Sequence, residues 1–276
     1  VLIPAPYWVS YPDIVLLADA SPVALPTDLS TRFKITPQQL EAAITPNSRL
    51  LVLNSPSNPT GSIYTRAELA ALAEVLIAHP QVWIATDDMY EHIRWTGEDY
   101  ANIVNVCAEL KPRTLVLNGV SKAYAMTGWR IGYAAGDARV IAAMAKVQSQ
   151  STSNPCSISQ VAAIAALNGK QDFLQQMVEA FKERHDYVVG ALQQMPGVEC
   201  APADGAFYSF PSFVGVMERL GIDDDVVLCE QILEQAQVAL VPGSAFGSPG
   251  YVRLSYATSM ETLREAMRRL KRFLDA

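Results

Sequence analysis

Short apolar runs alternate with helical patterns along most of the chain, and this alternation limits the possible folds more than any other feature. The apolar runs have the length of buried strands and end in polar or turn-forming residues. We expect strands at 50–54, 82–86, 113–118 and 129–135. We expect helices beginning at Thr36-Pro37 and at 65–79, 137–150 and 156–168. Such an order predicts an α/β fold with a mostly parallel mixed sheet flanked by helices.

The pattern changes near residue 170. A long amphipathic helix is expected at 172–195, and shorter elements follow it. The expected strands lie at 205–210, 238–241 and 252–256, and the expected helices lie at 225–235 and from 260 onward. We therefore predict a large domain at 1–170 and a smaller C-terminal α+β domain at 171–276.

Composition and charge exclude several classes of protein. The net charge is −7 and no long basic run occurs, so we expect no binding to nucleic acid or to anionic membranes. No apolar stretch reaches the length of a membrane span. The four cysteines and three histidines are scattered, which predicts no metal site and favours a reducing, cytoplasmic location.

Three polar residues follow three of the expected strands. Asn58 follows the first strand, Asp87 the second and Lys122 the third. Ligands of open α/β sheets bind at the carboxyl ends of the strands, so we expect these side chains to surround one ligand. Each has a simpler explanation as well. Asn58 could serve the turn before Pro59, Asp87 could cap a helix, and Asp88 could take its place.

The surroundings of Lys122 indicate a particular ligand. Ser121 precedes it, glycines lie on both sides, and Arg130 follows eight positions later. A lysine that is partly shielded from water loses proton affinity and becomes an amine nucleophile, while an arginine offers a fixed fork of donors to a phosphate. A protein needs this combination to hold pyridoxal phosphate (PLP) as a Schiff base. The alternative is a surface lysine in a polar turn.

Four motifs, in this order and spacing, make the chain resemble the class I aminotransferases of PLP fold type I, most closely the bacterial branch of aspartate and prephenate aminotransferases. They are Ser57-Asn58-Pro59-Thr60-Gly61, Asp87-x-x-Tyr90, Ser121-Lys122 with Met126-Thr127-Gly128-Trp129-Arg130, and Val252-Arg253-Leu254-Ser255. Family members carry a further segment before Pro4, with a phosphate-binding loop and a tyrosine that reaches the partner subunit. We therefore expect the PLP-binding domain at 1–170 to lack its N-terminal part, and the isolated chain to hold PLP weakly or to be inactive.

The resemblance implies catalytic roles for three residues. Lys122 would form the internal aldimine and then move a proton between the substrate and the cofactor. Asp87, chosen over Asp88 by its offset to Tyr90, would pair with the pyridine nitrogen. Tyr90 would donate a hydrogen bond to the phenolic oxygen of the ring, together with Asn58. A buried core tyrosine with a satisfied hydroxyl is the alternative for Tyr90.

The resemblance also implies the remaining contacts. Ser121 and Arg130 would bind the cofactor phosphate. Arg253 would bind the substrate α-carboxylate, with Asn58 beside it, and Trp8 would lie against the ring or the substrate. A structural ion pair is the alternative for Arg253, and plain core packing is the alternative for Trp8.

The implied activity is transamination between an L-amino acid and a 2-oxo acid in a homodimer. Aspartate, glutamate, aromatic amino acids and prephenate all remain open as substrates. A PLP-dependent lyase or synthase on the same fold, or an aminotransferase-like regulatory domain, would carry much the same motifs.

Overall fold

A six-stranded sheet forms the centre of the first half of the chain in the computed structural model, which describes residues 1–275. The strand order is β2-β1-β3-β4-β5-β6. The strands are β1 (Leu2–Ala5), β2 (Val23–Pro26), β3 (Leu50–Asn54), β4 (Trp83–Asp87), β5 (Thr114–Gly119) and β6 (Gly132–Ala135). All neighbouring pairs are parallel except β5 with β6. The carboxyl ends of β3, β4 and β5 therefore lie along one edge.

Helices pack around this sheet, and their starts follow from local sequence. They are α1 (Ser10–Leu17), α2 (Pro37–Ala43), α3 (Arg66–Ala78), α4 (Ile103–Val106), α5 (Ala138–Ser151) and α6 (Ser157–Asn168). Reciprocal capping boxes begin three of them, through Thr36 with Gln39 at α2, Thr65 with Glu68 at α3 and Asn102 with Asn105 at α4. Helix α3 buries an apolar face in the same core as β3 and β4. The predicted starts of α2 and α3 are confirmed.

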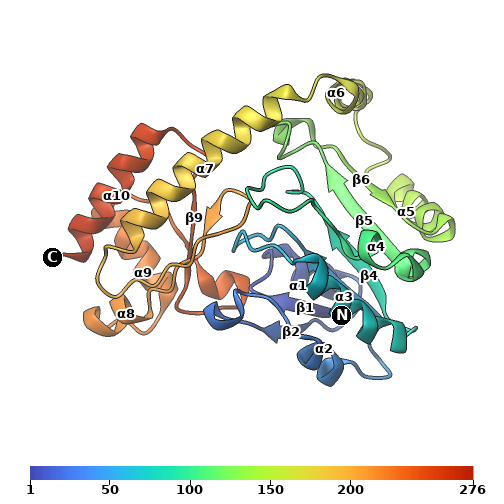
Figure 1. The fold of residues 1–276 in the computed structure, drawn as a ribbon, viewed down its shortest axis with the longest axis horizontal. Coiled ribbons are helices and arrows are strands. Elements are labelled where there is room, and N and C mark those ends of the chain that lie inside the picture. The colour runs from blue at the N-terminus through green and yellow to red at the C-terminus, as the bar shows by residue number, and fades with distance from the viewer. Residues whose placement is uncertain (276) are drawn as a thin grey trace.

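The second half of the chain has its own sheet and its own core. The antiparallel strands are β7 (Tyr208–Ser209), β9 (Val252–Ser255) and β8 (Val241–Pro242), in that order across the sheet. The helices are α7 (Asp172–Leu192), α8 (Val214–Leu220), α9 (Asp225–Gln231) and α10 (Met260–Leu274). Helix α7 runs from α6 toward the region of α8, α9 and α10 (Figure 1). Helix α10 buries the predicted residues Leu263, Met267, Leu270 and Leu274.

Several expected elements differ in the structure. Strand β6 begins at Gly132 rather than at 129, because Thr127–Trp129 forms a 3-10 turn that ends with Arg130 in the left-handed region. Strand β7 is shorter than predicted, since Gly205 makes only an isolated bridge to Arg94. The range predicted for the strand at 238–241 is wrong, because β8 covers only Val241–Pro242. Gln237 turns into the left-handed region after a π segment, and the ladder starts only at Val241.

Other differences concern helices. Helix α7 ends at Leu192 rather than at 195. Helix α1 was not expected from the sequence, and it contains Pro12 in its first turn. A proline is tolerated there because the first N–H groups of a helix have no intrahelical partner. Within residues 1–275, no helix combines the length and the apolar character that a membrane crossing requires.

Candidate active site

A pocket opens where the strands β3, β4 and β5 end. The residues that line it come from five separate segments of the first half of the chain. They are Trp8, Asn54, Asn58, Asp87, Met89, Tyr90, Ser121, Lys122, Thr127 and Arg130. The structure thus brings together every predicted site residue except Arg253, which reaches the pocket through Asn58.

The two neighbouring aspartates at the end of β4 have different surroundings. Asp87 lines the pocket, and its carboxylate accepts hydrogen bonds from the Tyr11 hydroxyl (2.5 Å) and the Met89 amide (3.2 Å). Burial raises the pKa of Asp87, while these bonds and the charge of Lys122 oppose that rise. Asp88 does not line the pocket. Only Asp87 is therefore available to a ligand in the pocket.

Asp88 instead belongs to a buried network beneath the site. Its carboxylate accepts hydrogen bonds from the Thr86 hydroxyl and the Asn102 side-chain amide, both at 2.6 Å. Its side chain is 1% exposed, and burial raises its pKa to about 6. The hydrogen bonds oppose that shift. Asp88 therefore ties the end of β4 to the start of α4.

The Lys122 amine lies close to aromatic rings and arginines rather than to a carboxylate partner. Its Nζ is 5.8 Å from the ring centroids of both Tyr90 and Phe207. Partial burial lowers the pKa of Lys122, the positive charges of Arg253 and Arg130 lower it further, and Asp87 opposes the change. A larger share of this amine is therefore neutral at a given pH than of an ordinary lysine.

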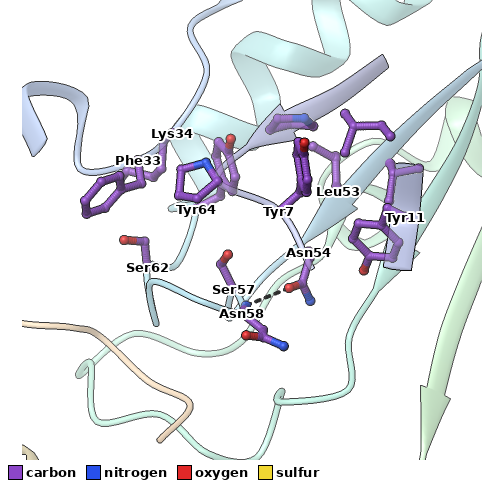
Figure 2. A pocket seen from close by; sticks show the side chains of 14 residues that line it. Tyr7, Tyr11, Phe33, Lys34, Leu53, Asn54, Ser57, Asn58, Ser62 and Tyr64 are labelled. Carbon is purple, nitrogen blue, oxygen red and sulfur yellow. Dashed lines mark hydrogen bonds between the residues drawn. The ribbon is translucent and has the colours of Figure 1, made fainter. Parts of the chain in front are cut away.

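Arg253 extends from β9 toward the loop that follows β3. Its NH1 donates to Asn58 Oδ1 at 3.0 Å, and the Asn58 amide donates to Asn54 Oδ1 at 2.8 Å. Figure 2 shows this second bond, seen from a smaller pocket that shares Asn54 and Asn58 with the first. The loop therefore holds Asn58 in the orientation that meets Arg253.

The charge of Arg253 is surrounded by polar and aromatic side chains. Among residues 1–275, no carboxylate lies within ion-pair distance of its guanidinium. Its Nε is buried without a hydrogen-bond partner. A partly buried cation whose Nε donor is fully buried and unpaired is costly unless an anion meets it. This geometry argues against a structural ion pair and favours an anionic ligand.

The remaining predicted residues lie around the rim. Trp8 is 37% exposed and packs edge-on against Tyr11, with ring centroids 5.3 Å apart. Trp8 is therefore not plain core packing. Arg130 is exposed and donates from NH1 to the Thr127 carbonyl at 3.0 Å. Ser121 lies beside Lys122 in the lining. Arg130 and Ser121 thus offer donors to an anion near the Lys122 amine.

Several residues that touch the predicted set were not predicted from the sequence, among them Tyr11 and Tyr208. Tyr11 bonds to Asp87 although 76 positions separate them, and Tyr208 bonds to Tyr90 across 118 positions. A signal for Tyr11 exists only once α1 is recognised, since it follows Trp8 by three positions and so shares its side of the helix start. No local signal indicates Tyr208.

Comparisons with known proteins agree on one family. The profile described as "Aminotransferase class I and II" matches residues 1–270. The chain is 55% identical to an aspartate/prephenate aminotransferase from Nitrosomonas europaea and 54% identical to one from Cereibacter sphaeroides, covering 99% of this chain and 70% of each relative.

Solved structures give the same result. An aspartate aminotransferase from Rhizobium meliloti superposes with a TM-score of 0.95 at 50% identity, over 99% of this chain and 70% of that one. The aspartate aminotransferase from Thermus thermophilus with maleate superposes with a TM-score of 0.90 at 40% identity, over 98% of this chain and 69% of that one.

Proposed function

The chain belongs to the class I and II aminotransferase family, whose aspartate aminotransferases use PLP, and from this premise we propose that Lys122 is the lysine through which it transaminates. The proposed reaction passes the amino group of aspartate, glutamate or an aromatic amino acid to a 2-oxo acid. The observation that carries the proposal is a half-buried amine of lowered pKa that shares one pocket with the buried carboxylate of Asp87.

The side chains in the pocket fit this cofactor. Asp87 supplies a buried carboxylate for the pyridine nitrogen, and Lys122 supplies an amine for the aldehyde. Tyr90 and Asn58 supply donors for the phenolic oxygen, and Trp8 supplies an aromatic face for the ring. Ser121 and Arg130 supply donors for the phosphate. When bound, PLP withdraws electrons from the substrate Cα, which no protein side chain can do.

Lys122 acts as the base of the reaction in this proposal. With the cofactor bound, its Nζ would hold the aldehyde until the substrate amine takes its place, and the freed amine would then take the proton from the substrate Cα and deliver it to the cofactor. A base needs a neutral amine near the working pH, and burial together with the charges of Arg253 and Arg130 supports that state. Asp87 keeps a proton on the ring nitrogen, since a buried carboxylate is best compensated by a cationic partner.

Arg253 orients the substrate by binding its α-carboxylate. The free donors of its guanidinium and its lack of an ion pair within residues 1–275 support this role. Arg253→Leu is therefore expected to weaken binding of amino and 2-oxo acids about 100-fold or more, the value of a charge-assisted bidentate pair. PLP binding should change little. Equal loss of cofactor would contradict the assignment.

The substrate class rests on the relatives. The two at 55% and 54% identity are named aspartate/prephenate aminotransferases, which supports aspartate as the amino acid and prephenate as a 2-oxo acid for this chain. A homodimer is part of the same proposal. Size-exclusion chromatography with light scattering tests it, and a monomer at micromolar concentration would contradict it.

Product analysis tests the reaction itself. The full-length protein, with saturating PLP and aspartate, should release oxaloacetate beyond one equivalent only when 2-oxoglutarate is also present, and glutamate should form in equal amount. Lys122→Ala is the matched control and should form neither product. Keto acid and ammonia released without an acceptor acid would indicate a lyase, and absence of turnover would indicate a non-catalytic domain.

A further inference from the structure

Tyr208 lies on β7, directly beside the strand that carries Arg253. Strands β7 and β9 are antiparallel, with Tyr208 opposite Ser255. Arg253 is two residues before Ser255, so its side chain extends on the same face of the sheet as that of Tyr208. Tyr208 is 6% exposed and does not line the pocket. It therefore acts on the site only through its neighbours.

The hydroxyl of Tyr208 pairs with that of Tyr90 at an O–O distance of 3.0 Å. Both side chains are buried, and within residues 1–275 neither hydroxyl has another hydrogen-bond partner. A hydroxyl has one proton to donate, so only one of the two can donate within the pair. When Tyr208 donates, the proton of Tyr90 is free to point into the pocket. A Tyr90 that both accepts and donates is also a stronger donor.

The ring of Tyr208 supports the guanidinium of Arg253. The guanidinium carbon lies 4.6 Å from the centroid of the Tyr208 ring and 5.0 Å from that of Phe246. Two aromatic rings thus hold this cation where no carboxylate does. Cation–π contacts leave the N–H donors free, which an internal ion pair would not.

We propose that Tyr208 is a positioning residue that serves both halves of the site. Its hydroxyl directs the Tyr90 proton toward the cofactor, and its ring holds Arg253 ready for the substrate carboxylate. This inference rests on the proposed function. The hydroxyl of Tyr208 affects the pKa of the bound cofactor, and the ring of Tyr208 affects the affinity for the substrate.

Tyr208→Phe tests the hydroxyl alone. Without the Tyr208 donor, Tyr90 becomes a weaker donor to the phenolic oxygen of the cofactor, and negative charge on that oxygen is less stabilised. The pKa of the visible absorption band of the PLP-loaded protein should therefore rise, by about half a unit on the scale of one neutral hydrogen bond. The KM for aspartate should change less than about twofold, because the ring remains.

Two further variants show whether the effect passes through Tyr90. In a Tyr90→Phe background, Tyr208→Phe should cause no additional change in the pKa of the band, since the pair is already broken. Tyr256→Phe is the matched control. Tyr256 is buried like Tyr208, but among residues 1–275 its hydroxyl has no hydrogen-bond partner, so removing it should leave the pKa of the band unchanged.

Tyr208→Leu removes the ring as well. It should raise the KM for aspartate about 3- to 30-fold, the range of a desolvated cation–π contact. If the wild-type protein forms the band but Tyr208→Phe leaves the pKa of the band unchanged, this inference is overturned and the proposed function is not. The same holds if Tyr256→Phe shifts the pKa of the band as much as Tyr208→Phe does. A full-length wild-type protein that forms no band with saturating PLP overturns the proposed function and this inference together.

Discussion

At the scale of single residues, the chemistry depends on which neighbour each titratable group meets. Lys122 faces Arg253 and Arg130, so its amine is neutral more often than that of a free lysine. The sequence allowed Asp87 to be chosen over Asp88, because the offset to Tyr90 is a local property. It could not reveal Tyr11, whose contact with Asp87 exists only in three dimensions.

The first residue-scale prediction concerns pH. The rate at which the protein forms a visible band with PLP should rise with pH and reach its midpoint below 10.5, the ordinary lysine value. Only the neutral amine attacks an aldehyde, so a lowered pKa moves the rise to lower pH. Arg253→Leu removes a nearby positive charge and should move the midpoint upward. A wild-type profile that matches Nα-acetyl-lysine would contradict this account of the Lys122 amine.

The second residue-scale prediction concerns Tyr11. Tyr11→Phe removes the hydroxyl that donates to Asp87 at 2.5 Å and should raise the pKa of that carboxyl further. A more readily protonated Asp87 pairs less well with a cationic ring nitrogen. The Kd for PLP, measured by fluorescence titration, should rise about 10-fold, the scale of one charge-assisted hydrogen bond.

The control for Tyr11 is Tyr7→Phe. Within residues 1–275, the Tyr7 hydroxyl makes no side-chain hydrogen bond, and Tyr7 contacts the rest of the chain through its amide and its ring. Its Kd for PLP should match the wild-type value. Equal affinity of the Tyr11→Phe and Tyr7→Phe proteins would refute the role of Tyr11.

At the scale of elements, local sequence signals predict where an element begins and which face it buries when the element is long or has a capping residue. Thr65 with Glu68 fixes the start of α3, and the spacing of apolar residues predicts the buried face of α10. The two-residue strands β7 and β8 could not be predicted with correct bounds. Both strands are defined by their hydrogen bonds to β9, which is distant from β7 in sequence, rather than by an apolar pattern of their own.

One element-scale prediction concerns the buried end of β4. Asp88 has a pKa of about 6 in the folded protein against 3.8 for an ordinary aspartate. A raised pKa means that its contribution to stability is present below about pH 4 and is lost as the pH rises through about 6. Relative to wild type, Asp88→Asn should therefore become more stable by about 2 to 3 kcal/mol between pH 4 and pH 7.

Urea unfolding of both proteins across that pH range measures the difference. Taking the difference between them cancels the other carboxyls, such as Glu68, whose pKa is lowered. A difference in unfolding free energy that stays constant from pH 4 to pH 7 would show that Asp88 is ionised throughout.

At the scale of the whole molecule, the chain has two separate large cores, and the segment that follows α7 bonds to loops of the first half. We propose the boundary near residue 170, with domains at 1–170 and 171–276, and the separate hydrophobic clusters support it. Gly61 connects the two parts, since its carbonyl accepts from the amides of Asp204 and Gly205. The turn residues around Gly61 indicated a loop, but nothing local indicated its partner.

Gly61→Ala should loosen this junction. Gly61 has φ +68°, and a Cβ there would lie 2.5 Å from the Gly205 carbonyl oxygen. We expect a loss of about 2 kcal/mol or more, which lowers Tm by about 4 to 8 °C in a chain of this size. Gly190→Ala is the matched control, because nothing lies within 4 Å of its added Cβ in α7. It should leave Tm unchanged or raise it slightly. Equal melting temperatures for the two variants would contradict the close approach at Gly61.

The most direct test asks which residue of the whole chain holds the cofactor. Borohydride treatment of the PLP-loaded protein fixes a lysine-bound cofactor as a stable secondary amine, and proteolysis with mass spectrometry locates it. We predict a single pyridoxyl group on the peptide that contains Lys122, and none in Lys122→Ala. A pyridoxyl group on another lysine, or on none, would contradict the assignment of Lys122.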